Sequence, residues 1–233
     1  MELTILMPCL NEQETLGICI EKAKRFIEEN KINGEILIAD NGSTDNSIKI
    51  AKTLGVRVVE IKNKGYGNAL REGTKYAKGK YVIMGDCDDS YNFLEIMPFL
   101  TKLREGNHLV MGNRFPGKME KGAMKVLHRY IGTPIISYVG RKKYGLKIGD
   151  FNCGLRGYEN KAILDLNCES EGMEYATEML IKAVKNNLKI EEIAIDFYKD
   201  KRNRKSHLNT IRDGIRHLKI LFKTKRNKKI TNE

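Results

Sequence analysis

The sequence predicts an α/β protein built on a mostly parallel sheet with helices on its faces. Short apolar runs alternate with longer segments whose apolar residues recur at helical spacing, and polar clusters follow directly on three of the runs. Alternating strands and helices form right-handed βαβ units, and such sheets bind ligands at the carboxyl ends of their strands. A length of 233 residues suits one large domain.

Five strands are expected in the first half of the chain, with helices between them. These strands cover residues 3–7, 35–39, 57–61, 81–84 and 108–111, and the helices cover 15–29, a segment ending at 54, 66–77 and 93–104. The pattern is less regular after residue 112. There we expect helices at 122–144, 173–186 and 208–222, an irregular stretch at 150–158 and a strand at 190–197.

The end of the chain is strongly basic. Lys and Arg outnumber Asp and Glu by 42 to 30, which gives a net charge of +12, and acids almost vanish between residues 199 and 229. The last predicted helix combines an apolar stripe with neighbouring Lys and Arg side chains, a pattern typical of helices that lie on membranes. We therefore expect a domain at 1–205, a basic amphipathic helix with a lysine-rich tail at 206–233, and an anionic membrane surface as a partner.

The five cysteines are expected to be reduced thiols. Their number is odd, no C-x-x-C spacing occurs, and no signal-peptide pattern precedes them. No apolar stretch reaches the roughly 18 residues that a bilayer crossing needs. Together with the basic end of the chain, these features predict a cytoplasmic protein that is peripheral at the cytoplasmic face of the cell membrane.

Asp86 and Asp88 are the strongest candidates for a metal site. They follow directly on the predicted strand at 81–84, where the chain is still nearly extended and both carboxylates can aim at one point. Two carboxylates so placed repel each other, and a hard cation removes that repulsion. Mg²⁺ or Mn²⁺ binds in this way through one or two carboxylates, several waters and substrate phosphate oxygens.

Several motifs occur in a fixed order, and together they resemble the family 2 glycosyltransferases of the GT-A fold. They are P-x-x-N-E at 8–12, D-N-G-S-x-D at 40–45, a glycine-rich helix start at 64–69, D-x-D at 86–88, G-N-R-F at 112–115, D-x-x-C-G-x-R at 150–156 and an acidic helix at 172–178. Within that family the chain is similar to the polyprenyl-phosphate sugar synthases, such as dolichyl-phosphate mannose or glucose synthase.

The resemblance implies a nucleotide-binding, Rossmann-like half and assigns roles in it. Pro8, Glu12 and Asp40 would hold the base and ribose of a nucleotide-sugar, whereas Asp86 and Asp88 would hold the Mg²⁺ or Mn²⁺ that bridges its diphosphate. A basic loop containing Arg202, Arg204 and Ser206 is similar to the loop that closes over the diphosphate.

The resemblance also implies transfer of a hexose from UDP- or GDP-hexose to a polyprenyl phosphate, with inversion at the anomeric carbon. A phosphate acceptor is already anionic and needs cations to hold it, and Arg114 and Arg129 are the candidates. Asp88 and Arg114 are therefore the expected catalytic residues.

Two other readings remain open. In the first, a glycosyltransferase of the same fold acts on a saccharide hydroxyl and requires a general base, for which Asp89 and Glu174 are the candidates. The second is a nucleic-acid-binding module, which only the positive charge supports because no interleaved aromatic platform accompanies it. We expect no nucleic-acid partner. A nucleotidyltransferase would need a glycine-rich basic loop after the first strand, and residues 8–12 contain neither glycine nor lysine.

Overall fold

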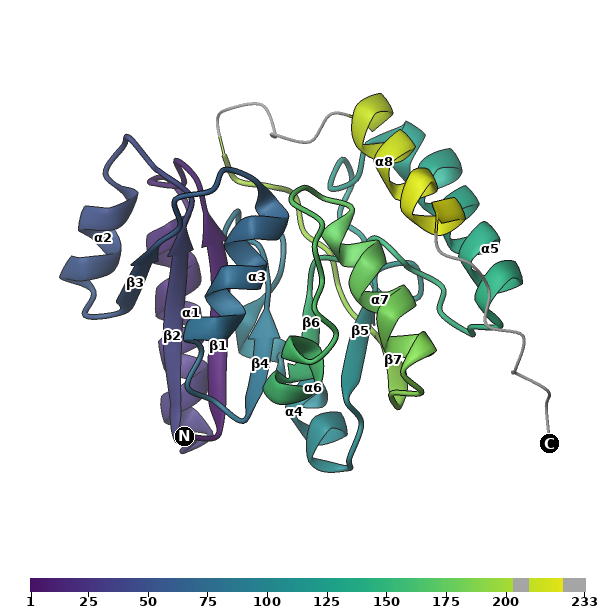
Figure 1. Ribbon diagram of the computed structural model, residues 1–233. Coiled ribbons are helices and arrows are strands. Elements are labelled where there is room, and N and C mark those ends of the chain that lie inside the picture. Colours follow the sequence, from purple (N-terminus) through teal and green to yellow (C-terminus); the bar gives the residue numbers. More distant parts are fainter. Residues whose placement is uncertain (203–209, 224–233) are drawn as a thin grey trace.

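A seven-stranded sheet forms the centre of the part of the chain that the computed structural model describes, residues 1–202 and 210–223 (Figure 1). The strand order is β3-β2-β1-β4-β6-β5-β7. The strands are β1 (Leu3–Cys9), β2 (Gly34–Asp40), β3 (Arg57–Glu60), β4 (Tyr81–Met84), β5 (Leu109–Asn113), β6 (Arg156–Glu159) and β7 (Ile190–Ala194). Only β6 runs antiparallel to its neighbours, β4 and β5, so the predicted mostly parallel sheet is confirmed.

The helices cover both faces of the sheet, because its central strands are apolar on both sides. In β1, Leu3, Ile5 and Met7 belong to one core cluster with α1 (Leu16–Glu29), α2 (Ser47–Thr53) and α4 (Met97–Arg104). Leu6 belongs to the opposite cluster. That cluster includes residues of α3 (Tyr66–Tyr76), α5 (Thr133–Tyr144), α6 (Asn160–Leu164), α7 (Tyr175–Lys185) and α8 (Thr210–Lys223).

Three predicted elements differ from the observed ones. The helix expected at 93–104 is a short 3-10 turn, η1 (Phe93–Glu95), followed by α4. The helix expected from residue 122 starts later and passes through a π-helical segment, η2 (His128–Gly132), before it becomes α5. Strand β6 falls in a stretch expected to be irregular, because its sequence Arg-Gly-Tyr-Glu contains no apolar run.

Helix α8 packs on α7 and α5, and of its predicted apolar stripe (Ile211, Ile215, Leu218 and Phe222) Leu218 packs against the core. Asp213, His217 and Leu221 are buried, whereas Ile215 and Phe222 of the predicted stripe are exposed. Thr177 of α7 and the Nδ1 atom of His217 lie 2.7 Å apart in a hydrogen bond. Within residues 1–202 and 210–223, no helix combines the length and the apolar character that crossing a bilayer requires.

Candidate functional site

The polar turns that follow β1, β2 and β4 meet at one edge of the sheet. These three strands are parallel neighbours, so their carboxyl ends lie side by side. Asn11 after β1 and Asp89 after β4 both have left-handed backbone conformations, with φ of 58° and 61°. Such conformations are uncommon for residues other than glycine and are concentrated at functional sites.

Asp86 lies against two other parts of the chain. The Tyr66 hydroxyl donates a hydrogen bond of 2.9 Å to its Oδ1 atom. Gly154 approaches from the other side, where a Cβ atom would come within 2.7 Å of Asp86 Oδ2. Burial, followed by the negative charge of Asp88, raises the pKa of Asp86 to about 6. The carboxylate pair therefore favours a cation beside it.

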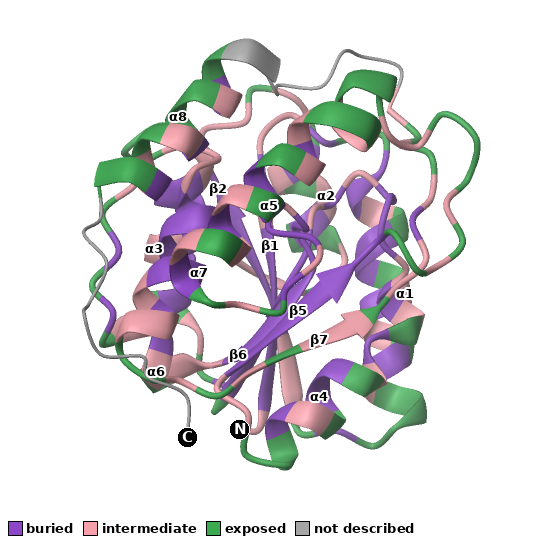
Figure 2. Cartoon of the chain, turned by 90° about the vertical axis from the view of Figure 1, so that its right-hand side faces the viewer, coloured by how far each residue is buried: buried purple, intermediate pink, exposed green. Residues whose placement is uncertain are grey.

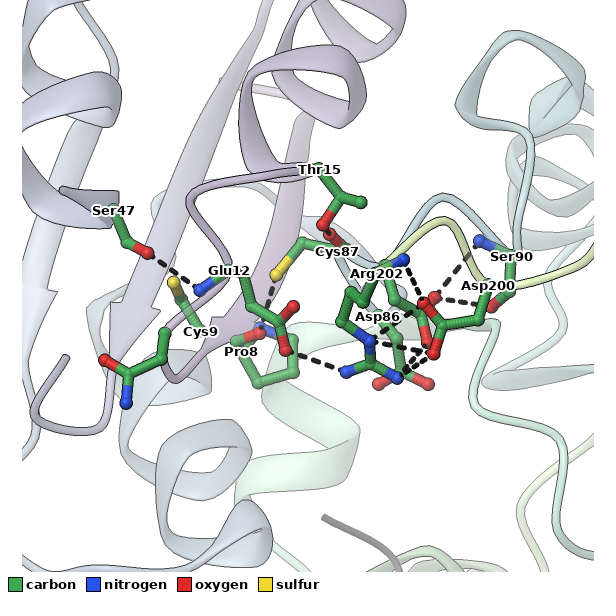
Figure 3. A network of polar contacts seen from close by, with 12 residues as sticks. Pro8, Cys9, Glu12, Thr15, Ser47, Asp86, Cys87, Ser90, Asp200 and Arg202 are labelled. Carbon is green, nitrogen blue, oxygen red and sulfur yellow. Dashed lines mark hydrogen bonds and ion pairs between the residues drawn. The ribbon is translucent and has the colours of Figure 1, made fainter. Parts of the chain in front are cut away.

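In the structure, the guanidinium of Arg202 stands next to this carboxylate pair (Figure 3). Its Nη2 atom donates to Asp88 Oδ2 at 2.9 Å, and its Nη1 atom donates to Glu12 Oε1 at 2.9 Å. Asp200 also pairs with this guanidinium, and Ser90 donates to Asp88 Oδ1 from both its backbone N–H and its hydroxyl. Arg202 thus joins the turn after β1 to the turn after β4.

The donor set fits a divalent metal of the Mg²⁺ or Mn²⁺ type. Across residues 1–202 and 210–223, no group of three or more His, Cys, Asp or Glu side chains is arranged to enclose a metal ion. Asp86 and Asp88 supply only two carboxylates. Mg²⁺ is commonly held by one or two carboxylates, with waters and substrate phosphates completing its shell.

The turn after β2 is fixed by two side chains. Asp40 is buried and accepts hydrogen bonds from the backbone N–H groups of Gly42 and Ser43 at 2.9 and 3.1 Å. Asn41 accepts a hydrogen bond of 2.7 Å from the N–H of Gly65, directly before α3. Gly65 has a φ of 132°, and a Cβ atom there would lie 2.2 Å from the carbonyl oxygen of Glu171. The glycine-rich helix start is therefore held against the turn after β2.

The predicted ribose and base residues are close to these turns. The backbone N–H of Glu12 donates to Ser47 Oγ at 2.8 Å, which ties the turn after β1 to the start of α2. The carbonyl oxygen of Pro8 accepts a contact of 3.1 Å from the Cys87 thiol, between the two metal-site aspartates in sequence. Pro8, Glu12, Asp86 and Asp88 thus belong to one region.

Arg114 is buried and paired with Asp150. Its Nε and Nη2 atoms donate to the two Asp150 oxygens at 2.6 and 2.9 Å, and its guanidinium carbon lies 5.1 Å from the centre of the Phe197 ring. Burial, the largest single cause, lowers the pKa of Arg114, but the charge and hydrogen bond of Asp150 together with nearby Tyr91 and Cys153 raise that pKa overall. The positive charge of Arg114 also lowers the pKa of Asp86, which indicates that the Arg114 guanidinium lies near the carboxylate pair.

The remaining candidates lie in different places. Arg129 is in η2, with its guanidinium carbon 5.4 Å from the centre of the Tyr130 ring. Among the described residues, no hydrogen bond or ion pair joins it to the carboxylate pair. Arg204 and Ser206 lie outside the described residues, so the predicted loop is represented by Arg202 alone.

The chain matches a family model described as Glycosyl transferase family 2 over residues 4–166. The chain belongs to glycosyl transferase family 2.

Two relatives in this family come from Haloferax volcanii. The chain is 34% identical over 221 residues to the low-salt glycan biosynthesis hexosyltransferase Agl6, in a match that covers 94% of this chain and 53% of Agl6. It is 27% identical over 198 residues to a dolichyl-phosphate hexose transferase, with 84% and 82% of the two chains covered. This chain therefore spans about half the length of Agl6.

The fold is the GT-A fold of family 2. The structure of glucosyl-3-phosphoglycerate synthase from Mycobacterium tuberculosis, in complex with Mn²⁺, UDP and phosphoglyceric acid, matches with a TM-score of 0.71. The match covers 95% of this chain and 78% of that chain at 18% identity. The predicted family, GT-A fold and enzyme class are thus confirmed.

Sequence reasoning missed the residues that orient the predicted ones. Tyr66 was seen only as the start of a helix, yet its hydroxyl contacts Asp86. Asp150 was part of a family motif without a role, yet it binds Arg114. Glu192 of β7 accepts hydrogen bonds from the backbone N–H groups of Gly149 and Asp150, and no motif marks it.

Proposed function

We propose that this family 2 enzyme transfers a hexose from UDP- or GDP-hexose to a polyprenyl phosphate, with Mg²⁺ or Mn²⁺ and with inversion. The observation that carries the donor side is the Asp86 and Asp88 pair beside Glu12 at the carboxyl edge of the sheet. The similarity to a dolichyl-phosphate hexose transferase supports the lipid-phosphate acceptor.

On the donor side, Pro8, Glu12 and Asp40 hold the nucleoside, and Asp86 and Asp88 hold the metal. When bound, the metal would neutralise the negative charge that develops on the leaving diphosphate. Arg202 stands next to the same carboxylates. When the donor binds, the Arg202 guanidinium would release these carboxylates and bind oxygens of the diphosphate instead. We assign Arg204 and Ser206 to the same loop, as in the sequence prediction.

On the acceptor side, an oxygen of the polyprenyl phosphate attacks the anomeric carbon while the bond to the nucleoside diphosphate breaks. Asp150 occupies the Nε and Nη2 atoms of Arg114 and not its Nη1 atom, so Nη1 is assigned to the acceptor phosphate. Arg129 is the second candidate. A single displacement of this kind gives inversion at the sugar carbon.

The contacts of Asp89 favour a phosphate acceptor over a hydroxyl acceptor. A hydroxyl needs a general base, and Asp89 was one of two candidates. Its side chain is fully buried and is bound by the ammonium groups of Lys22 and Lys201. Glu174, the other candidate, lies 4.0 Å from the guanidinium of Arg216 of α8, and no hydrogen bond to its buried Oε2 atom is found among the described residues. An anionic phosphate needs neither group.

The test is a panel of UDP- and GDP-hexoses incubated with a short polyprenyl phosphate, with the product detected by mass. We expect a polyprenyl-phosphate hexose that forms with Mg²⁺ or Mn²⁺, disappears with EDTA and returns when excess metal is restored. Full activity in the chelator would contradict the metal assignment. Transfer to a saccharide hydroxyl with none to the lipid phosphate would favour the alternative acceptor.

A further inference from the structure

An unusual number of large apolar side chains are exposed on the outer side of η2, the two helical residues that precede it, and α5. They project where the helix faces away from the sheet, and between 47% and 74% of each is accessible to solvent. They are Val126, Leu127, Tyr130, Ile131, Ile135 and Tyr138. Their spacing follows one side of a helix, and the π-helical segment lies in the middle of the run. Single exposed apolar residues need no explanation, whereas a contiguous group indicates a binding surface.

The same part of the chain carries positive charge only. No Asp or Glu occurs between Glu120 and Asp150, and Lys121, Lys125 and Lys142 are exposed in that interval. An apolar stripe bordered by cations is the composition of helices that bind anionic membranes.

Helix α8 continues this surface. It lies beside α5, and the ammonium of Lys143 in α5 donates a hydrogen bond of 2.7 Å to the carbonyl oxygen of Leu221 and lies 5.3 Å from the centre of the Phe222 ring. Ile215 and Phe222 are exposed on α8, and so are its cations Arg212, Arg216, Lys219 and Lys223. Asp213, the one acid of this helix, is turned inward and buried. Figure 2 shows the exposed residues along the outer sides of both helices.

We propose that the outer side of η2, α5 and α8, here called the α5–α8 face, docks on an anionic lipid bilayer with its apolar side chains among the acyl chains. This docking deepens the proposed function and rests on it in one respect, that the acceptor is a lipid. A second copy of the chain is a poorer occupant, because two such faces would bring like charges together. Anionic lipid headgroups, in contrast, complement the positive charges of the α5–α8 face.

The α5–α8 face is connected to the acceptor side of the candidate site. The Ser137 hydroxyl accepts a hydrogen bond of 3.2 Å from the N–H of Phe151. Gly140 lets α5 approach the Phe151 ring so closely that a Cβ atom would lie 2.2 Å from it. Phe151 directly follows Asp150, the partner of Arg114. Docking on a bilayer therefore places the Arg114 region close to lipid headgroups.

The experiment uses the full chain with two exposed residues of α5 changed together, Ile135→Ser and Tyr138→Ser. The matched control changes the same residue types elsewhere, Ile18→Ser and Tyr76→Ser, because the exposed fractions are similar: 49% and 54% against 41% and 53%. Flotation is measured with vesicles of phosphatidylcholine alone and with added phosphatidylglycerol, without nucleotide-sugar. Unchanged thermal midpoints show that both variants are folded.

We expect wild type and control to float with the anionic vesicles and the α5 variant to bind them on the order of tenfold more weakly, because binding scales with buried apolar area. Equal binding by the α5 variant would overturn the proposal. So would a wild-type dimer that the α5 variant converts to monomer in light scattering, since the face would then join two copies. Transfer to a short, water-dispersed polyprenyl phosphate is assayed separately, so a failure of the proposed reaction leaves the vesicle result standing.

Discussion

The guanidinium of Arg202 compensates the negative charge of two separate turns. It binds Glu12 after β1 and Asp88 after β4, and only 10% of its side chain is exposed. Hydrogen bonds between ionised groups are stronger than neutral ones, especially in partly buried sites. This edge of the sheet is therefore organised by a cation that belongs to the chain.

Asp88→Asn should weaken metal-dependent donor binding. The amide oxygen can still accept the two hydrogen bonds from Ser90, so the turn keeps its shape. The amide NH2 group cannot accept from Arg202, and the side chain lacks the charge that a divalent ion needs. We expect the affinity for UDP or GDP in the presence of Mn²⁺ to fall at least about tenfold in titration calorimetry. Asp165→Asn, an exposed change of the same kind, is the control and should bind normally. An unaltered affinity in Asp88→Asn would remove Asp88 from the metal site.

Arg114→Ala should lower the stability of the fold as well as the rate of the reaction. It leaves the fully buried carboxylate of Asp150 without its partner, and breaking a buried pair in this way costs about 3 to 5 kcal/mol. Urea unfolding measures that loss. Adding Asp150→Asn should restore much of the stability, because no unpaired charge then remains. Arg104→Ala breaks the exposed pair with Glu2 and should cost less than about 1 kcal/mol. Equal losses at the two sites would contradict the burial argument.

For this reason Arg114→Lys, and not Arg114→Ala, tests the acceptor role. Lysine keeps the charge beside Asp150 but not the planar set of donors that can hold two anions at once. We expect a higher KM for polyprenyl phosphate and a lower kcat, with donor affinity close to wild type. If the KM for the lipid phosphate stays unchanged, another group holds the acceptor.

Sequence and resemblance predicted the charged residues of the site but not their partners. Glu12, Asp88 and Arg202 come together in the structure, although 190 positions separate Glu12 from Arg202. Tyr66 and Glu192 escaped notice because their contacts depend on how distant elements pack, and a tyrosine at a helix start or a glutamate in an edge strand has no distinctive local pattern.

At the scale of elements, α8 is docked by a buried polar contact. His217 is 6% exposed, and burial followed by the charge of Arg156 lowers its pKa from 6.5 to about 4. The folded protein thus binds this proton only near pH 4, whereas the unfolded chain binds it near 6.5. Stability from this group is full above pH 6.5 and is lost as the pH falls toward 4.

His217→Gln should remove that pH dependence. Glutamine can keep a hydrogen bond to Thr177 but does not titrate, so the difference in unfolding free energy between wild type and variant should change by about 3 kcal/mol between pH 7 and pH 4. Chemical denaturation across this range measures it. His108→Gln, at a partly exposed histidine, should follow the wild-type curve. Parallel curves for wild type and His217→Gln would show that the histidine does not couple α8 to pH.

Elements with a strong periodic pattern were predictable, and elements fixed by long-range contacts were not. The five apolar runs correspond to β1 to β5 within a few residues. Strand β6 has no such run: Arg156 is fully buried with its guanidinium bonded to the carbonyl oxygens of Phe151, Cys153 and Ala176. Helix α8 was predicted, but most of its buried face was not, because a polar contact to α7 selects that face.

At the scale of the whole molecule, the proposed function assigns different tasks to the two halves of the sheet. Strands β1, β2 and β4 carry the turns assigned to the nucleotide-sugar and metal, and β5 and β6 carry the segments with Arg114 and Asp150. The α5–α8 face lies beyond β5 and β7, at the end of the molecule opposite α2 (Figure 1). Soluble donor and lipid acceptor are thus expected to arrive from different sides.

Strand β6 reverses the direction of the chain in the middle of an otherwise parallel sheet. The chain leaves the sheet after β5, forms η2 and α5, and re-enters it as β6 between β4 and β5. This excursion is anchored at both ends by sheet hydrogen bonds, and its strand β6 pairs with β4 and β5 and not with β1, β2 or β3. A change of side chains in the helical part of this excursion, η2 and α5, would therefore alter the acceptor side while the paired strands that carry the donor-side turns stay as they are.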